Sequence, residues 1–318
     1  MPGRRGLRGV PRLRAAQQAR RHRLPGQRPG VQVMRVAVVG LGRMGGALAV
    51  RLVGAGHEVH GADPVAAVRD RLVAAGGSAS PTAAEAIAAA QVVVLLLPDS
   101  NAVESVLRDP VVRSALAPDA IVVDSGSSDP ARTRALAEEL AAAGVDLVDA
   151  PVSGGVLGAE NGTLTVMAAG PDALLDRVAP VIEVFGRVVR VGPVGAGHAV
   201  KALNNLLSAS HLLLTSEAVL AGRRFGVEPS VLIDVVNGSS GRSGSSELKW
   251  PRYILPGTFD SGFALALMVK DARIAQGLLA ETGVDSAVAR ATLAAWSHAL
   301  DELAPGADHT EIARWLER

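Results

Sequence analysis

Short apolar runs alternate with alanine-rich segments through the first two thirds of the chain. Runs of this length that are rich in Val and Ile predict buried strands, and the longer segments between them predict helices. Strands that alternate with helices form βαβ units, so the pattern predicts a mainly parallel, doubly wound α/β sheet. The expected strands are 36–39, 59–62, 92–96, 121–123, 145–148, 164–168 and 188–191, and the expected helices are 44–54, 65–75, 100–107 and 131–143.

After Gly197 the pattern changes. Residues 198–225 have the pattern of one long helix, and no convincing strand follows it. The Ser- and Gly-rich segment 238–246 is expected to be a loop. Further helices are expected over 229–236, 264–282 and 285–302.

The change of pattern predicts two domains. An α/β domain over 34–194 is expected to precede an all-helical domain over 195–318, which is entered through the long helix. A chain of 318 residues, 48% of them apolar, is long enough for two separate cores. It contains no apolar run long enough to span a membrane, so we expect a protein of the cytoplasm with no membrane partner.

Three glycines follow the first expected strand at the spacing of a dinucleotide-binding Rossmann fingerprint. Gly40 would make the tight turn, Gly42 would let the backbone approach a pyrophosphate, and Gly45 would let the helix pack closely on the strand. The N-terminus of that helix offers N–H groups to the phosphates. The whole motif reads Gly40, Leu41, Gly42, Arg43, Met44, Gly45.

An acidic residue, Asp63, follows the second expected strand, 18 positions after Gly45. A carboxylate at this place accepts hydrogen bonds from the ribose hydroxyls and repels a 2′-phosphate. The sequence therefore favours NAD over NADP as cofactor.

The composition excludes several kinds of chemistry. The chain has no cysteine, which rules out disulfides, thiol nucleophiles and Cys-based metal sites. The seven histidines form no cluster with metal-ligand spacing, so no metal is expected.

The basic residues are unevenly distributed. Residues 1–33 hold nine arginines and no acid, and subtracting nine from the formal net charge of +1 leaves −8 for the remainder. This segment is expected to be a basic, disordered extension. Its composition fits a nucleic-acid-binding tail, an Arg-rich targeting peptide, a disordered arm without function, or sequence upstream of a true start at Met34. The last interpretation is favoured because Met34 directly precedes the first strand, and no nucleic-acid partner is expected.

Polar side chains interrupt the long helix near its beginning. Lys201, Asn205 and Ser208 are spaced i, i+4 and i+7 and therefore share one face. They fit a solvated stripe, or a general acid/base lysine that is oriented by an amide one turn away. Partial burial would lower the pKa of such a lysine towards working pH.

Two further segments could bind an anion. Ser153, Gly154 and Gly155 follow an expected strand, at the edge of the sheet where open α/β folds bind ligands. Lys270 interrupts the apolar run that opens a later helix, and Asp271 follows it. Lys270 could reach solvent along its stem or point at an anion.

Together these segments resemble the β-hydroxyacid dehydrogenase family, which includes 3-hydroxyisobutyrate dehydrogenase. Four signatures occur in the family's order: the glycine fingerprint at 40–45, Asp-Ala-Pro-Val-Ser-Gly-Gly at 149–155, Gly-Ala-Gly-His-Ala-Val-Lys-Ala-Leu-Asn-Asn at 195–205, and Lys-Asp at 270–271. The resemblance begins at Met34 and covers about nine tenths of the chain.

The resemblance implies a role for individual residues. Lys201 matches the catalytic lysine, and Asn205 matches the amide that orients the substrate. Lys270 matches the lysine that closes over cofactor and substrate. Ser153, Gly154 and Gly155 match the substrate site, and Leu97, Pro98 and Ser127 match cofactor-contacting loops, although relatives usually have Thr in place of Ser127.

The resemblance implies oxidation of a small 3-hydroxy acid to its semialdehyde or 3-oxo acid by a homodimer or homotetramer. L-Threonate dehydrogenase and tartronate semialdehyde reductase are alternatives on the same scaffold. Imine reductases and non-catalytic nucleotide-binding members look similar but generally lack the lysine, so Lys201 argues against both.

Overall fold

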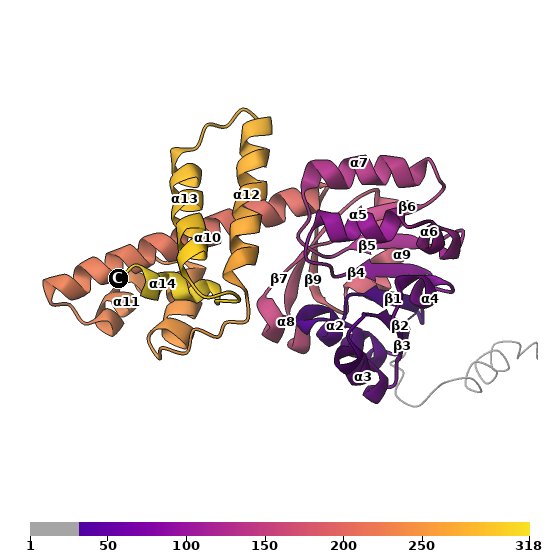
Figure 1. Cartoon of the computed structure of the whole chain (residues 1–318), viewed down its shortest axis with the longest axis horizontal. Coiled ribbons are helices and arrows are strands. Elements are labelled where there is room, and N and C mark those ends of the chain that lie inside the picture. Colours follow the sequence, from indigo (N-terminus) through magenta and orange to yellow (C-terminus); the bar gives the residue numbers. More distant parts are fainter. Residues whose placement is uncertain (1–31) are drawn as a thin grey trace, which may run out of the picture.

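The computed structural model describes residues 32–318. The basic segment predicted over 1–33 therefore lies outside the described residues except for its last two positions. Two parts are visible in Figure 1: an α/β part made of residues 35–192, and a helical part that extends away from it along one long helix.

The α/β part is built on one nine-stranded sheet in the order β3-β2-β1-β4-β5-β6-β8-β7, with β9 paired to β8. Most strand pairs are parallel, but β8 runs antiparallel to β6 and β7. The strands are β1 (Arg35–Val39), β2 (Glu58–Ala62), β3 (Ser78–Ser80), β4 (Val92–Leu95), β5 (Ile121–Asp124), β6 (Asp146–Asp149), β7 (Val152–Ser153), β8 (Leu164–Ala169) and β9 (Gly186–Gly192).

All seven predicted strands are present, so the mainly parallel doubly wound sheet is confirmed. The sequence pattern missed β3 and β7. Ser78–Ser80 contains no apolar run, and Val152–Ser153 is only two residues long, so both depend on pairing with a neighbouring strand.

Helices cover both faces of the sheet, because successive side chains of a strand point to opposite sides. Val36 and Val38 of β1 pack in one core with α2 and α9, whereas Ala37 and Val39 pack in a second core with α5 and α7. The helices of this part are α2 (Arg43–Gly54), α3 (Ala66–Ala74), α4 (Ala83–Ile87), α5 (Ser100–Arg108), α6 (Pro110–Ala115), α7 (Pro130–Ala141), α8 (Gly155–Asn161) and α9 (Asp172–Ile182).

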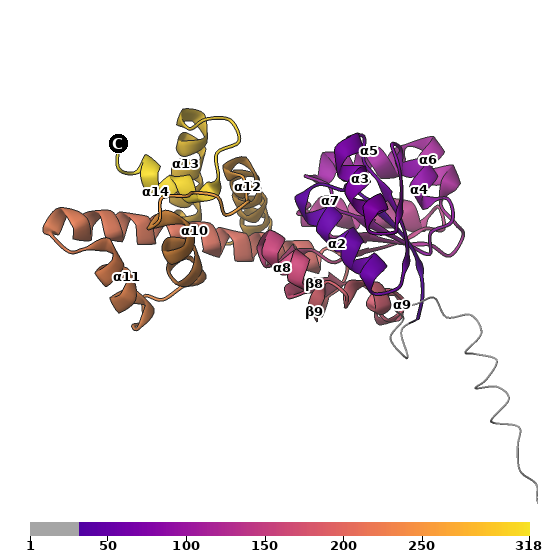
Figure 2. The same cartoon turned by 90° about the horizontal axis from the view of Figure 1, so that it is seen from below.

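The helical part is organised along α10 (Ala196–Phe225), which is 30 residues long and leads out of the α/β part (Figure 2). The buried Trp296 lies in its core and donates to the Ala209 carbonyl of α10. No strand follows β9 in the described chain. The other elements are α11 (Pro229–Asn237), the π-helical segment η2 (Ser245–Ile254), α12 (Leu265–Glu281), α13 (Ala287–Glu302), the short 3-10 segment η3 (His309–Glu311) and α14 (Ile312–Trp315).

The loop predicted over 238–246 is wrong at its C-terminal end. Ser245 and Ser246 are buried and begin η2. The hydroxyl of Ser246 bonds to the backbone of Ser243, and that of Ser245 donates to the Ser208 carbonyl of α10. The hydroxyls of these serines thus bond to backbone groups in place of water. The amino-acid composition of the segment gives no sign of these hydrogen bonds.

A buried carboxylate fixes the start of α10. Asp149, at the end of β6, accepts hydrogen bonds from the amides of Gly195 at 2.7 Å and His198 at 2.9 Å. These are N–H groups that a helix leaves unpaired at its first turn, and the helix dipole favours a negative charge there. Burial raises the pKa of Asp149, while the charge of His198 and the two amide bonds oppose that rise. The position of α10 is thus fixed relative to the sheet.

Candidate active site

A cavity of about 540 Å³ lies between the α/β part and the helical part. It opens at the carboxyl ends of β1, β4 and β5, where the strand order of the sheet reverses and α/β folds bind ligands. Its wall combines the glycine fingerprint, the loops after β4 and β5, Lys201 of α10, and the start of α12. The residues of the wall include Gly42, Arg43, Met44, Gly45, Leu97, Pro98, Ser125, Ser127, Gly155, Lys201, Ser261, Gly262, Phe263, Lys270, Asp271 and Asp308.

Two of the three fingerprint glycines are required by close backbone contacts, and the third faces open space. Gly40 has a φ of +93°, and a Cβ there would lie 2.5 Å from the Leu96 carbonyl oxygen. A Cβ at Gly45 would lie 1.9 Å from the Gly40 carbonyl oxygen, so only glycine lets α2 approach β1 this closely. At Gly42 a Cβ would meet nothing within 4 Å. That open space, in front of a helix whose N-terminus has no side-chain cap, fits a dinucleotide pyrophosphate.

Asp63 is attached directly to the fingerprint. One of its carboxylate oxygens accepts from the Leu41 amide at 2.9 Å and the other from the Val65 amide at 2.9 Å. Neither Asp63 nor Gly40 and Leu41 belongs to the wall of the cavity. The Leu41 side chain instead packs in the core between α2 and the sheet. The carboxylate therefore lies beside the turn, where the ribose next to the pyrophosphate would lie.

Lys270 connects the two parts of the molecule. It comes from α12, and its ammonium donates to the carbonyl of Pro98 at 3.0 Å and to the carbonyl of Ser127. Both carbonyls belong to the cofactor loops predicted from sequence. The contact of Ser127 with Lys270 uses the backbone carbonyl and not the side-chain hydroxyl.

Lys201 stands in the cavity wall among charges of both signs. Burial lowers its pKa, the carboxylate of Asp271 acts to raise it, and the ammonium of Lys270 acts to lower it. Asp271 is itself 2% exposed; its Oδ1 lies 3.0 Å from the Lys270 nitrogen, and its Oδ2 accepts from Asn205 at 2.6 Å. Asn205 is buried and lies outside the cavity wall, so its amide orients Asp271 in this structure.

The predicted anion site after β6 lies next to the cavity. Gly155 is part of the wall, whereas Ser153 and Gly154 are not. Gly154 has a φ of +135° and Gly155 a φ of +68°, conformations that glycine adopts without strain. The structure thus brings Gly155, Lys201 and Lys270 to one cavity.

Several wall residues were missed by the sequence reasoning. The buried hydroxyl of Ser125, after β5, has no hydrogen-bond partner within the described chain. Asp308 accepts from the hydroxyl of Ser261 and the amides of Gly262 and Phe263, and it holds this segment against the cavity. Burial acts to raise the pKa of Asp308, but hydrogen bonds from His309, Thr310 and Ser261 lower it well below its usual range. No motif links position 308 to the fingerprint, so only packing reveals it.

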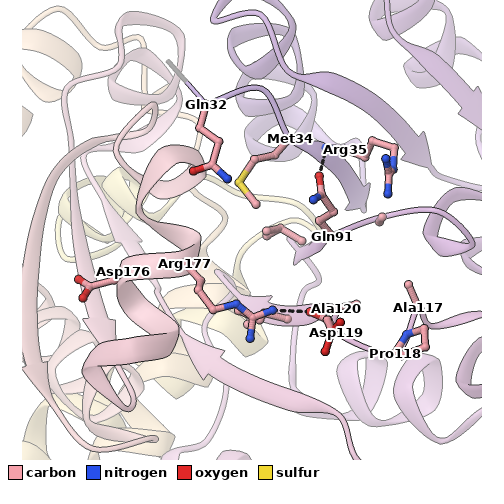
Figure 3. Close-up of a pocket in the computed structure, with 13 residues that line it drawn as sticks. Gln32, Met34, Arg35, Gln91, Ala117, Pro118, Asp119, Ala120, Asp176 and Arg177 are labelled. Carbon is pink, nitrogen blue, oxygen red and sulfur yellow. Dashed lines mark hydrogen bonds between the residues drawn. The ribbon is translucent and has the colours of Figure 1, made fainter. Parts of the chain in front are cut away.

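A second cavity, of about 560 Å³, lies at the opposite edge of the sheet, where β1, β4 and β5 begin (Figure 3). Two of its polar side chains are paired within the chain: Arg177 donates to the Asp119 carbonyl, and the Gln91 side chain accepts from the Arg35 amide. It combines no acid, base or nucleophile in the way the first cavity does. Residues 32–318 also contain no His, Cys, Asp or Glu group suited to a metal ion, and no helix in that range is long and apolar enough to cross a membrane.

Comparison with known proteins divides the chain at the start of α10. Residues 35–195 match the family model described as the NAD-binding domain of 6-phosphogluconate dehydrogenase. Residues 195–316 match the model described as NAD-binding of NADP-dependent 3-hydroxyisobutyrate dehydrogenase.

Individual relatives cover most of the chain. A 2-(hydroxymethyl)glutarate dehydrogenase of Eubacterium barkeri is 37% identical over 257 residues, covering 80% of this chain and 84% of the relative. An NAD-dependent L-serine dehydrogenase of Pseudomonas aeruginosa is 37% identical over 249 residues, covering 76% and 84%. The solved structure of Mycobacterium tuberculosis 3-hydroxyisobutyrate dehydrogenase with L-serine has a TM-score of 0.82 and 30% identity, covering 90% of this chain and 100% of that one.

The opposed charges around Lys201 predict opposite effects of two substitutions on its pKa. Asp271→Asn removes the neighbouring anion, so the pKa of Lys201 should fall. Lys270→Met removes the neighbouring cation, so it should rise. NMR titration of protein labelled with 13Cε-lysine measures the pKa of Lys201 in each variant. The Lys201→Met variant identifies the Lys201 signal by its loss. Shifts in the same direction, or none, would contradict the electrostatic arrangement described here.

Proposed function

Since the chain belongs to the β-hydroxyacid dehydrogenase family, we propose that it oxidises a small 3-hydroxy acid of the 3-hydroxyisobutyrate type to its semialdehyde or 3-oxo acid. It is an NAD-dependent oxidoreductase of CH–OH groups, with an NAD-binding domain at residues 35–195. One observation carries the proposal: Lys201, with its lowered pKa, shares a cavity with the dinucleotide fingerprint.

Lys201 would act as the general acid/base. Burial disfavours its ammonium form, so a larger share of the amine is neutral near physiological pH and available to accept the hydroxyl proton. In the reverse direction the protonated amine returns that proton to the carbonyl oxygen. When held at the glycine fingerprint, NAD would supply the acceptor for the hydride that leaves the hydroxyl-bearing carbon of the substrate.

Neighbouring residues would orient the reactants. We assign the substrate carboxylate to Ser153, Gly154 and Gly155, where a hydroxyl and backbone amides adjoin the cavity wall. Asn205 would act through Asp271, since the 2.6 Å bond between them fixes the carboxylate that faces Lys201. Lys270 would hold the helical part over the cofactor through the carbonyls of Pro98 and Ser127.

Asp63 supports NAD over NADP. Its carboxylate is fixed by two backbone amides beside the fingerprint turn, and it would repel a 2′-phosphate bound there. The family model of the helical part carries the description NADP-dependent, yet that part contributes no residue to this turn. Asp63 therefore carries the preference. Gly40, Leu41, Gly42, Arg43, Met44, Gly45, Leu97, Pro98, Ser127 and Lys270 are proposed to complete the cofactor site.

We also propose a homodimer or homotetramer in which α10 takes part. Val200, Leu203, Leu207 and Leu214 form an exposed stripe on this helix, with Leu207 58% and Leu214 66% exposed. Their spacing of three, four and seven residues places them on one face. Contiguous apolar surface of this kind is unusual on a monomer. The proposed domain division, 34–194 and 195–318, places this stripe in the second domain.

Replacing Lys201 by Ala should reduce kcat about 10²- to 10⁴-fold, the range for loss of a general acid/base. NADH affinity should change less than threefold, because the fingerprint is untouched. The measurement is NADH formation on 3-hydroxyisobutyrate, L-serine, L-threonate and 2-(hydroxymethyl)glutarate, and tartronate semialdehyde reduction. Arg187→Ala, which removes an exposed cation of β9, is the control. If Lys201→Ala turns over normally, its catalytic role is wrong.

Asp63→Asn should lower the ratio of kcat/KM with NAD to kcat/KM with NADP about tenfold or more, because one charge that repels the 2′-phosphate is lost. Asp70→Asn removes a charge from the exposed surface of the adjacent α3 and should leave the ratio unchanged. Equal effects of the two variants would mean that net charge, and not the position of Asp63, sets the preference.

A charge on the exposed stripe of α10 should dissociate the oligomer. Leu207→Glu combined with Leu214→Glu is expected to give a monomer by size-exclusion chromatography with light scattering. Val111→Glu, at a 65% exposed position of α6, serves as the matched control and should leave the mass unchanged. A wild-type protein that is already monomeric would refute the proposal.

A further inference from the structure

The chain contains only three lysines, against 29 arginines. Two of them, Lys201 and Lys270, line the cavity between the two parts. The third, Lys249, lies on η2 and has no role in the mechanism above. Lysine differs from arginine as a compact, flexible point charge whose pKa shifts readily when it is buried. Because the chain otherwise uses arginine for its positive charges, Lys249 is a candidate for binding a ligand.

Lys249 reaches the same face of α10 that carries the catalytic lysine. Its nitrogen donates to the hydroxyl of Ser208 at 2.9 Å. Ser208 follows Lys201 by two helical turns, a rise of roughly 10 Å. The cavity wall includes Lys201 and Asp308, and both charges are close enough to influence Lys249. Ser208 and Lys249 therefore lie outside the cavity wall, farther along α10 from Lys201 and within electrostatic reach of it.

The charge of Lys249 is not neutralised by an ion pair within residues 32–318. Asp308 is the carboxylate that influences it, but the Asp308 oxygens already accept from Ser261, Gly262, Phe263 and Thr310. Burial lowers the pKa of Lys249 to about 8, with Asp308 opposing and Lys201 reinforcing the change. At pH 7 the amine is thus still mostly protonated. A half-buried ammonium with one neutral hydroxyl as partner is suited to receive an anion.

We propose that Lys249 and Ser208 form a second anion site, which binds a distal carboxylate and so selects dicarboxylic 3-hydroxy acids. The first carboxylate would bind at Ser153–Gly155 and the hydroxymethyl group at Lys201. A chain of a few carbons would then carry the second carboxylate along α10 to Lys249. This inference rests on the proposed function and specifies its substrate class.

A purely structural role for Lys249, holding η2 on α10, makes a different prediction. Replacing Lys249 would then weaken the binding of all substrates equally and lower the thermal stability of the protein. The test therefore compares substrates that differ in the distal carboxylate. 2-(Hydroxymethyl)glutarate carries that group and 3-hydroxyisobutyrate lacks it.

The wild-type enzyme should prefer 2-(hydroxymethyl)glutarate over 3-hydroxyisobutyrate at least tenfold in kcat/KM. Lys249→Met should raise KM for the dicarboxylate about 10- to 100-fold, the range for a lost charged hydrogen bond, with little change in kcat. Its effect on KM for 3-hydroxyisobutyrate should stay below threefold. Lys249→Arg should restore part of the preference, and Ser208→Ala should lower it less than Lys249→Met does. Equal losses on both substrates would overturn the second anion site and leave the proposed function intact.

A binding measurement keeps the site testable if no hydroxy acid is turned over, which would count against the proposed function. Isothermal titration calorimetry on the NADH-saturated protein compares glutarate with its monoamide, glutaramate, which has nearly the same shape and one charge fewer. Tighter binding of glutarate that disappears in Lys249→Met supports the site. Equal affinity for both compounds overturns it.

Discussion

The contact between the Asp149 carboxylate and the first turn of α10 is the constraint on which the site depends. It joins the end of β6 to the helix that carries Lys201, Asn205 and Ser208. The side chain acts as a helix cap supplied by another element, so the helix begins at a fixed height above the sheet edge. Because β1 and β6 belong to the same sheet, the glycine fingerprint and Lys201 are held at a fixed separation without any direct bond between them.

The helical part is tied a second time, by Lys270, to the loops that follow β4 and β5. Its bonds to the carbonyls of Pro98 and Ser127 cross the cavity, while its contact with Asp271 stays within α12. Asp271 and Lys270 then act on Lys201 with opposite signs. The pKa of the Lys201 amine is thus lowered by burial and adjusted by one anion and one cation, of which the cation, Lys270, also joins the two parts. Position and acidity therefore depend on the same few side chains.

Buried polar groups in the cavity wall lower the free energy of unfolding, and they are retained because they can bind a ligand. A buried amine without a directly bonded counter-ion is unfavourable for the folded state, and the fold compensates through its three apolar cores. The hydroxyl of Ser125 belongs to the same description, since it is buried and has no hydrogen-bond partner within residues 32–318. Unsatisfied polar groups of this kind are typical of sites that receive a ligand.

The sequence by itself determined the alternating strands and helices, the fingerprint at Gly40, Gly42 and Gly45, and the face of α10 shared by Lys201, Asn205 and Ser208. These features are local: a turn needs glycine where a Cβ would collide, and residues i, i+4 and i+7 share a helix face whatever surrounds them. Only the tertiary structure decided that Asn205 bonds to Asp271, that Lys270 meets the backbone of Ser127, and that Asp308 borders the cavity. The π-helical start at Ser245 and the contact of Lys249 with Ser208 belong to the same group. Each depends on how elements distant in the chain pack against α10, and one sequence does not encode that packing in any local spacing.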